Sequence, residues 1–273
     1  MSRIIHLLAL LLLFETIPMK AQYAVFSGMQ DVISSGMART GLTISEPLNF
    51  INNPSRISDI QHSILAVQSR PYSYVSGLYS VGASALYKSN PREGFGIKWQ
   101  SEGSRELNEN IVGICYGRKI GKSSGMALGL NYFIRNLPES KNEGTIIPEI
   151  SVHSKLNNSL SAAALVINPI PIQIKKMAPL PTIIRLGIGY QLSSKLNFQL
   201  EVHKTSLLPV SGNVGLEYHP VKNISIRSGC TTRGQISFGI GYQYRKSMFI
   251  DSSLEYFQVI GPVMGLGINY LIL

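Results

Sequence analysis

Hydrophobic and polar residues alternate along most of this chain with a period of two. The alternation is regular in residues 196–203, 236–242 and 264–270, where a large apolar side chain occupies every second position. The positions between them carry Gly, Ser, Asn, Gln, Glu or His. Because successive side chains of a strand point to opposite faces of its sheet, each segment has one apolar face and one small or polar face. Such strands suit a soluble sandwich, with the apolar faces packed together, or a membrane barrel, with the apolar faces in lipid.

The same pattern predicts 14 strands between residue 62 and the end of the sequence. Short polar sequences such as Asn90-Pro91 and Ser193-Ser194 separate them and suit hairpin turns. A membrane strand takes about 9–11 residues, so 14 strands leave little chain for loops, and 12 strands is the alternative number. The predicted ranges are 62–70, 78–88, 93–101, 109–119, 124–135, 145–154, 159–168, 182–192, 195–204, 211–219, 222–230, 233–244, 246–256 and 262–272.

Two parts of the chain lack the alternation. Residues 23–61 are rich in Gly, Ser and Thr, with short helical turns predicted around Asp31–Met37 and a tight turn at Asn52–Ser55. We predict that this part forms a plug or hatch segment for a barrel of residues 62–273. The stretch from Asn168 to Pro181 contains four prolines, which exclude a central strand. It predicts a long loop.

Residues 1–22 have the features of a secretory signal peptide. Arg3 supplies the positive start, residues 4–14 form a short apolar region, and the small Ala21 offers a cleavage point. The apolar region is shorter than the roughly 20 residues of a membrane-spanning helix. Cleavage after residue 21 removes Arg3, Lys20 and Glu15, so the net charge falls from +10 to +9. A signal peptide implies export, so the predicted strands belong to a protein of a membrane or of the space outside the cytoplasm.

Composition favours the membrane barrel over the sandwich. Hydrophobic residues make up 44% of the chain and charged residues only 15%, against about 25% in typical soluble domains. No other stretch is long and apolar enough for a membrane-spanning helix. We therefore predict an all-β, transmembrane antiparallel barrel in the outer membrane of a Gram-negative bacterium. Tyrosines near predicted strand ends, at outward positions, suit an aromatic girdle; they are Tyr87, Tyr116, Tyr132, Tyr190, Tyr218, Tyr242, Tyr256 and Tyr270.

The positive charge of the chain does not indicate nucleic-acid binding. Lys and Arg are scattered, and no basic run is interleaved with aromatic residues. Loop cations instead suit contact with outer-membrane lipid and the phosphates of lipopolysaccharide, or they simply keep the loops soluble. The loop cations considered are Arg92, Lys119, Lys122, Lys175 and Lys176.

Three stretches of the chain resemble a known group of membrane barrels. Residues 34–41 and the following Asn52–Ser55 are similar to a glycine-rich element and an Asn-Pro-Ala element. Residues 180–187 read Leu-Pro-Thr-Ile-Ile-Arg-Leu-Gly, and residues 214–270 repeat strands such as Phe-Gly-Ile-Gly-Tyr. In these features the chain resembles the Bacteroidetes outer-membrane barrels of the PorV/PorQ type, relatives of the FadL-like superfamily.

This resemblance implies a 14-stranded barrel with the N-terminal segment folded inside it as a hatch. It also implies one of two non-enzymatic functions. The first is an accessory or docking component of type IX-like protein secretion, with secretion-system proteins or exported cargo as partners. The alternative is a FadL-like transporter of hydrophobic small molecules, with a hydrophobic ligand. The inward positions carry mostly Gly, Ser, Asn and charged residues, which favours the docking function or a small-solute pore over a passage for hydrophobic molecules.

Charged residues of both signs occupy inward positions of the predicted strands. Such charges are tolerated inside a barrel only when they are paired or hydrated, so they form either a structural ion-pair lattice or a polar pathway. Glu217 and Arg227 lie on neighbouring predicted strands. The candidate residues for contact with a ligand or the plug are Asn52, Asn53, Pro54, Arg185, Glu201, His203, Glu217, Arg227, Asp251 and Glu255.

No motif in the sequence predicts catalysis, a metal site or a cofactor. His153 with Ser151 and Glu149, or His203 with Glu201, follows from strand alternation alone, and no Gly-x-Ser-x-Gly element is present. The histidines and cysteines lack metal-ligand spacing. The two cysteines lie in separate predicted strands, far apart in the sequence, and we expect both thiols to be free.

Overall fold

The computed structural model describes residues 29–44, 50–72, 77–104, 107–136, 143–170, 180–206, 208–258 and 260–273. The predicted signal peptide, residues 1–22, lies outside the described residues, as does most of the predicted loop 168–181. The strands are β1 (Ser63–Pro71), β2 (Tyr79–Asn90), β3 (Glu93–Gly103), β4 (Asn108–Ile120), β5 (Ser124–Asn136), β6 (Glu143–Lys155), β7 (Leu160–Ile167), β8 (Ile183–Ser193), β9 (Leu196–Thr205), β10 (Ser211–Val221), β11 (Ile224–Thr231), β12 (Ile236–Tyr244), β13 (Met248–Phe257) and β14 (Gly261–Ile272).

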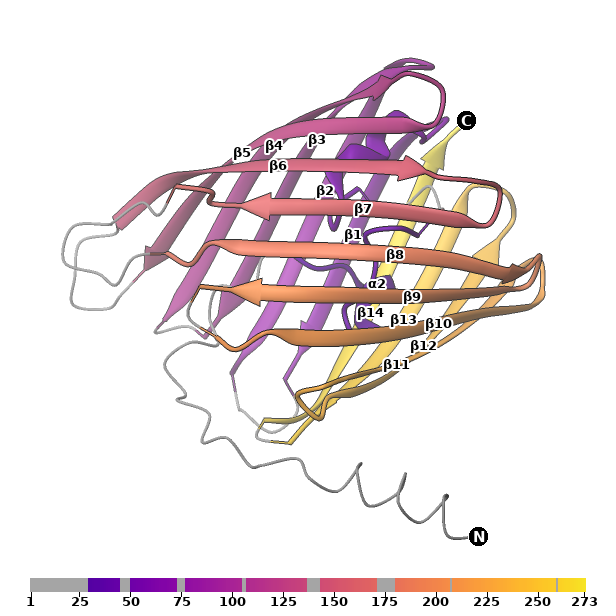
Figure 1. The fold of residues 1–273 in the computed structure, drawn as a ribbon. Helices are drawn as coiled ribbons and strands as arrows, with labels where there is room; N and C mark the ends of the chain where they lie inside the picture. Colours follow the sequence, from indigo (N-terminus) through magenta and orange to yellow (C-terminus); the bar gives the residue numbers. More distant parts are fainter. Residues whose placement is uncertain are drawn as a thin grey trace, which may run out of the picture.

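All 14 strands form one closed antiparallel barrel (Figure 1). Each strand pairs with its neighbours in sequence, and β1 closes the sheet by pairing with β14 from Ser63↔Ile272 to Ser69↔Leu266. Closure leaves no unpaired strand edge, which is the condition for a sheet in hydrocarbon. Every predicted strand is present, and each end lies within three residues of its prediction. The prediction of 14 strands is confirmed, and the alternative of 12 is wrong.

The two rims of the barrel differ in their connections. Six turns of two to four residues join β2–β3, β4–β5, β6–β7, β8–β9, β10–β11 and β12–β13, and we call their side the short-turn rim. The other connections form the long-loop rim. The longest of these runs from Ile167 to Ile183, where Asn168 donates a hydrogen bond from Nδ2 to the carbonyl of Leu180 at 2.9 Å. This bond holds the two ends of the connection together.

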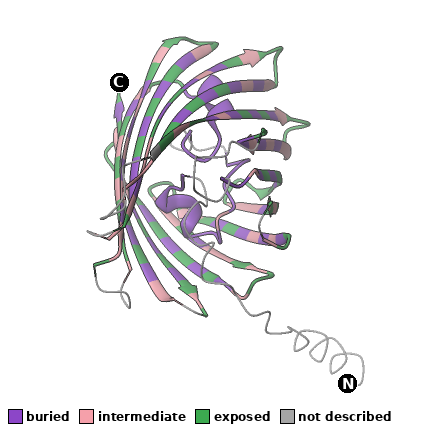
Figure 2. Cartoon of the chain, turned by 90° about the vertical axis from the view of Figure 1, so that its left-hand side faces the viewer, coloured by how far each residue is buried: buried purple, intermediate pink, exposed green. Residues whose placement is uncertain are grey.

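Buried and exposed residues alternate along the strands (Figure 2), because successive side chains face the lumen and the outer surface. In β8 the odd-numbered residues 183–189 are buried, whereas the even-numbered residues 184–190 are exposed and apolar. Ile114 and Ile240 on the outer surface are both 59% exposed, while Lys98 and Glu149 inside are 2% and 3% exposed. Apolar side chains outside and charged side chains inside are the reverse of a soluble protein and typical of a barrel in lipid.

Residues 29–44 and 50–60, which we call the N-terminal segment, lie inside the barrel (Figure 2). They include the short helix α2 (Val32–Ser35) and the 3₁₀ helix η2 (Pro54–Ser58). α2 lies against the wall so closely that a Cβ atom on Gly36 would sit 2.9 Å from the Cα atom of Gly239. Short helical turns are thus present where the sequence predicts them. Among the described residues, no helix has the length and apolar character needed to cross a membrane.

Candidate functional site

Glu201 of β9 binds the backbone of the N-terminal segment. Its Oε1 accepts hydrogen bonds from the amides of Gly41 and Leu42, the latter at 2.7 Å. Its Oε2 lies 2.8 Å from both Arg185 Nη2 and His203 Nε2. The side chain is fully buried, and this set of charge-assisted hydrogen bonds offsets the loss of its hydration. Glu201 therefore attaches the segment to the wall at β8 and β9.

Further wall residues hold the segment in an unusual backbone conformation. Ala38 and Arg39 have φ angles of 54° and 66°, a region that residues other than glycine rarely adopt. The amide of Ala38 donates to Ser237 Oγ at 2.5 Å, and Asn213 Nδ2 donates to the carbonyl of Ala38 at 2.8 Å. Arg185 Nη2 donates to the carbonyl of Arg39 at 2.9 Å. Contacts from three strands thus stabilise this turn.

Three charged residues pair with one another on β10, β11 and β13. Arg227 Nε lies 2.8 Å from Glu217 Oε1, and Arg227 Nη1 lies 2.6 Å from Asp251 Oδ1. The predicted neighbours Glu217 and Arg227 are direct partners in the strand register. All three are at most 3% exposed, so the removal of Arg227 would leave two buried carboxylates without its charge.

A second ion-pair group joins the N-terminal segment to β13 and β1. Glu255 of β13 accepts from Gln235 Nε2 at 2.8 Å and from Arg39 Nε at 3.2 Å, and it lies 3.5 Å from Arg70 Nη1. Arg70 of β1 also donates to Ser35 Oγ in α2 at 2.9 Å. This group connects the N-terminal segment to the strands at which the barrel closes.

η2 is held against β6 by a short chain of polar contacts. His153 Nδ1 lies 3.0 Å from Ser55 Oγ, and His153 Nε2 lies 3.0 Å from Asp59 Oδ2. Burial alone would raise the pKa of Asp59, but the hydrogen bond from His153 and the charge of Arg56 outweigh it and hold the pKa well below its usual range. The Ser55 hydroxyl is fully buried and bonds Asn53 Oδ1 at 2.6 Å, so the group has the contacts of a structural attachment.

The structure separates the predicted site residues into three groups. Arg185, Glu201, His203 and Glu255 lie at the wall beside the N-terminal segment, as described above, and Glu217, Arg227 and Asp251 pair within the wall. The other three belong to the segment itself. Asn52 Nδ2 donates to Ser34 Oγ at 2.8 Å, Asn53 Nδ2 donates to the carbonyl of Leu42 at 2.6 Å, and Pro54 is the first residue of η2. Contact of any of these residues with a ligand stays a prediction.

An apolar group on the inner wall was missed in the sequence. We call it the apolar inner patch; it lies on β4–β8 near the long-loop rim. Leu42 of the N-terminal segment and Leu180 pack against it. Its buried members are 0–7% exposed although they face the lumen side of the wall. The patch consists of Ile111, Phe133, Ile147, Ala163, Leu165, Ile167 and Ile183.

A local signal for this patch is present in the sequence. Near the long-loop rim, consecutive apolar residues replace the alternation at residues 132–134, 146–147, 165–167 and 183–184. Two apolar residues in a row place one on each face of the strand. The lumen therefore combines a charged wall with this patch and with a second apolar cluster, in which the N-terminal segment meets wall residues such as Ile64 and Leu86. The lining is less uniformly small and polar than the sequence indicates.

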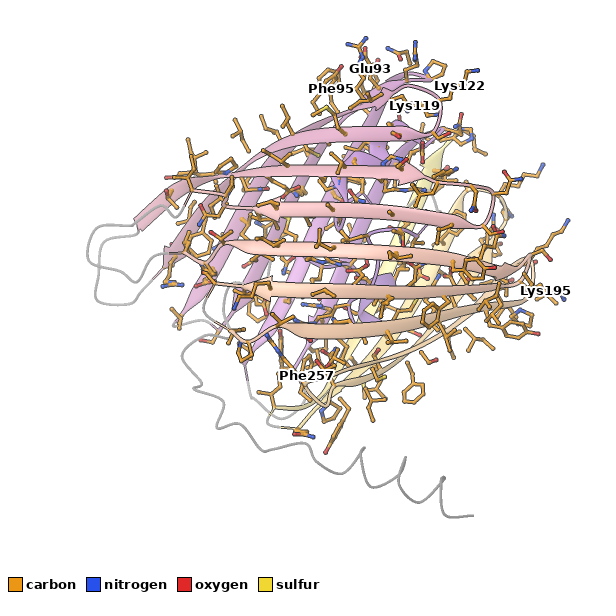
Figure 3. The ribbon with its side chains drawn as sticks, in the orientation of Figure 1. Glu93, Phe95, Lys119, Lys122, Lys195 and Phe257 are labelled. Atoms are coloured by element: carbon orange, nitrogen blue, oxygen red, sulfur yellow. The ribbon has the colours of Figure 1, made fainter. Side chains whose placement is uncertain are left out.

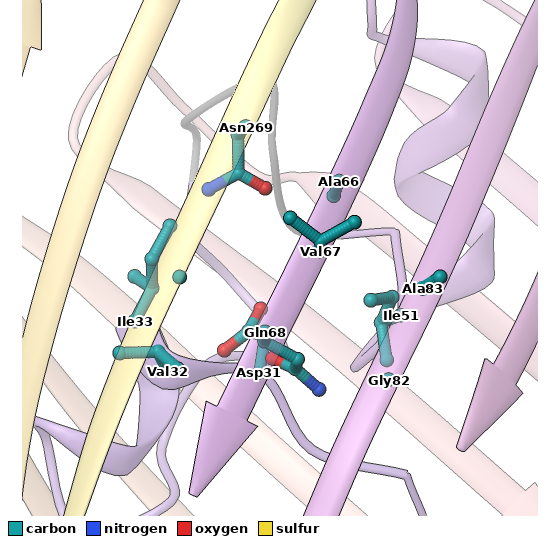
Figure 4. A pocket seen from close by; sticks show the side chains of 11 residues that line it. Asp31, Val32, Ile33, Ile51, Ala66, Val67, Gln68, Gly82, Ala83 and Asn269 are labelled. Carbon is teal, nitrogen blue, oxygen red and sulfur yellow. The ribbon is translucent and has the colours of Figure 1, made fainter.

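Two hollows adjoin the N-terminal segment. The first, of about 10 Å³, lies between Asp31, Gln68 and β14 and has room for about one water molecule (Figure 4). The second, of about 400 Å³, lies at the short-turn rim and is lined by polar residues such as Thr43, Asn197 and Gln199. In the part of the chain that the structure describes, no group of three or more His, Cys, Asp or Glu residues could hold a metal ion. Cys115 and Cys230 are both free, as expected.

The barrel is similar to several solved structures, although no family model and no curated protein matches the sequence. A FadL homologue of Pseudomonas aeruginosa has a TM-score of 0.68 at 10% identity, over 89% of this chain and 98% of that one. The toluene transporter TbuX of Ralstonia pickettii has 0.69 at 11%, over 89% and 98%. The toluene transporter TodX of Pseudomonas putida has 0.68 at 11%, over 90% and 97%.

At these identities the similarity establishes the fold alone. This chain has the fold of FadL-like barrels, which confirms that part of the resemblance. The resemblance to the PorV/PorQ type stays a prediction.

Proposed function

We propose that this chain is an outer-membrane channel of a Gram-negative bacterium that admits small hydrophobic molecules, with the N-terminal segment as its plug. The apolar outer surface and the closed sheet support a location in lipid. The barrels of similar fold include two toluene transporters and the monoaromatic hydrocarbon channel CymD. This proposal is the alternative that the resemblance implied, in place of the docking function.

The apolar inner patch is the observation that carries the proposal. A channel for polar solutes has no need of adjoining Phe133, Ile147 and Ile167 side chains on its inner wall. The patch lies near the long-loop rim, where a hydrophobic molecule that enters from that side would reach it. Apolar binding surfaces with a few polar groups beside them are typical of sites for small hydrophobic ligands.

Leu42 gives the plug a means to respond to such a ligand. It packs against the patch with a side chain that is 0% exposed, and its amide is held by Glu201 at 2.7 Å. A hydrophobic molecule on the patch competes for the surface that Leu42 covers. Displacement of Leu42 would weaken the contact between the segment and this side of the wall.

Uptake measurements test the proposal. In a deletion strain, we expect loss of labelled toluene or fatty-acid uptake, restored by the wild-type chain but not by Ile147→Asn. The control variant Ile147→Leu keeps an apolar side chain of the same size and should restore uptake. Heat-modifiable gel mobility verifies that each variant forms a barrel. Equal uptake with and without the wild-type chain would contradict the proposal.

The same strain tests the docking function. Normal uptake together with exported cargo that accumulates in the periplasm would favour an accessory component of secretion. The long loop predicted at residues 168–181, which is a candidate surface for such docking, lies mostly outside the described residues. The secretome of the deletion strain is therefore compared with that of the parent strain in the same experiment.

A further inference from the structure

Each turn of the short-turn rim, taken with the residue on either side of it, carries a cation. These cations are Arg92, Lys122, Lys155, Lys195, Lys222, Arg245 and Lys246, and all seven side chains are exposed. Figure 3 shows Lys122 and Lys195 projecting from this rim, with Phe257 at the opposite rim. Over the same residues, Glu93 at the start of β3 is the only acidic one. It is already engaged by Tyr116, Asn90 and Arg118 on its own side of the barrel.

None of these seven cations forms an ion pair with a described carboxylate. Lys195 Nζ donates to the carbonyl of Pro220, and Arg245 lies over the ring of Tyr244 at 5.3 Å. At the long-loop rim, the exposed cations among the described residues are fewer, namely Lys204 and Arg233. The short-turn rim therefore presents an uncompensated positive ring.

Outward aromatic residues lie directly inside this ring. Tyr87, Phe95 and Tyr116 are consecutive partners across β2, β3 and β4. Beyond β1, Tyr244 and Tyr270 flank Met248 in the register of β12, β13 and β14. Aromatic side chains of membrane proteins concentrate at the level of the lipid headgroups. The seven cations thus lie just beyond that level, where lipid phosphates are found.

We propose that the positive ring binds the anionic phospholipid headgroups of the leaflet around the short-turn rim, with phosphatidylglycerol as the lipid class. This inference rests on the membrane location in the proposed function. A lipid leaflet surrounds the whole barrel, and the cations occur at all six turns around it. A single docked protein would instead cover one arc. Cations near a membrane surface attract anionic lipids at short range and lose this attraction in high salt.

Native mass spectrometry of the purified full chain tests the ring with defined lipids. We expect retention of phosphatidylglycerol at least tenfold above phosphatidylcholine, reduced by high salt. Replacement of all seven cations by Gln should abolish the preference, whereas Lys204→Gln with Arg233→Gln at the opposite rim should keep it. Two partial variants, Arg92/Lys122/Lys155→Gln and Lys195/Lys222/Lys246→Gln, should each lose part of the preference, which covers the case that the sevenfold variant fails to fold.

Three outcomes would overturn the inference while the barrel remains intact by heat-modifiable mobility. They are an unchanged phosphatidylglycerol preference in the Gln variants, equal binding of both lipids by the wild type, and stronger binding of lipopolysaccharide through the same seven cations. Binding of polyglutamate in place of lipid would identify a protein-docking surface and would also overturn it. A chain that stays monomeric in water without detergent would refute the proposed function itself, which distinguishes the two failures.

Discussion

The two sides of the lumen wall meet the N-terminal segment in different ways. On β8–β14, buried ion pairs and amide hydrogen bonds hold residues 29–43, as at Glu201 and Glu255. On β4–β8 near the long-loop rim, the contact is apolar and Leu42 is the residue that makes it. A charged contact fits one partner geometry, whereas an apolar surface accepts any apolar molecule of suitable shape. The wall at β8–β14 is therefore suited to anchoring the segment, and the apolar wall at β4–β8 is suited to ligand exchange.

The largest effect is expected from the charged side. Arg227→Ala leaves Glu217 and Asp251 buried without their counter-charge and should lower the free energy of unfolding by about 3–5 kcal/mol. Urea unfolding followed by heat-modifiable mobility measures this loss. The exposed Arg245→Ala is the matched control, with an expected change within about 0.5 kcal/mol. Equal stability of both variants would show that the three charges are hydrated rather than paired.

Removal of the apolar contact should have a smaller effect on stability and a larger one on uptake. Leu42→Ala should cost about 2–4 kcal/mol from lost packing, and it should raise the uptake of a hydrophobic probe because the patch is uncovered. Met37→Leu conserves the volume of a buried residue of the same segment and should change neither measurement strongly. Reduced uptake by Leu42→Ala would contradict the competition between Leu42 and the ligand.

The close approach of two backbones gives a further test of the anchored side. Gly36→Ala places a Cβ atom 2.9 Å from Gly239 Cα and should destabilise the chain by about 1–3 kcal/mol through overpacking. Gly129→Ala is the control, because its Cβ atom would meet neighbours at the ordinary distance of 3.4 Å or more. Chemical denaturation measures both. If Gly36→Ala left the free energy of unfolding unchanged, α2 would not lie against β12.

The smallest effect is the pH dependence of the attachment of η2. The pKa of Asp59 is depressed in the folded chain, so its contribution to stability is present above the unfolded-state pKa of about 3.9 and is lost as the pH falls below it. Asp59→Asn should therefore be less stable than the wild type at pH 7, and the difference should shrink toward pH 3. Unfolding midpoints at several pH values measure it.

Asp31 provides the opposite case. Burial raises the pKa of Asp31, partly offset by its hydrogen bonds with Ser34, so its charged form disfavours folding above the unfolded-state pKa. Asp31→Asn retains a side-chain oxygen for the cap of α2. We expect its stability relative to the wild type to rise with pH, opposite in sign to Asp59→Asn. If the stability of both variants relative to the wild type changed with pH in the same direction, the opposite pKa shifts of Asp31 and Asp59 would be contradicted.

The sequence predicts the barrel better than it predicts the lumen. Strand positions follow from the period-two alternation, which depends only on the residues of each strand, so all 14 ranges are confirmed. The parity of the strands also places Glu217 and Arg227 at inward positions of neighbouring strands, and the register of the structure makes them direct partners. The contacts of the N-terminal segment cannot be predicted in this way, because they join residues far apart in the sequence. The bond from Ala38 to Ser237 spans 199 residues, and nothing near either residue indicates it.

The apolar inner patch can be predicted from the sequence only in part. Consecutive apolar residues such as Ile146-Ile147 and Ile183-Ile184 are visible in the sequence, but only the closed barrel shows that their inward members adjoin. The positive ring is similar. Each turn cation is an ordinary exposed residue by itself, and the ring appears when the topology brings all six turns to one rim.

Fluorescence of the single tryptophan of the chain tests directly whether the outer surface of the barrel faces lipid. Trp99 belongs to β3, faces outward and is 40% exposed. With the full chain reconstituted in vesicles that contain acyl-chain-brominated phosphatidylcholine, we predict strong quenching of Trp99 fluorescence by bromine and little quenching by aqueous iodide. Emission that iodide quenches and bromine leaves unchanged would place Trp99 in water and contradict the membrane barrel.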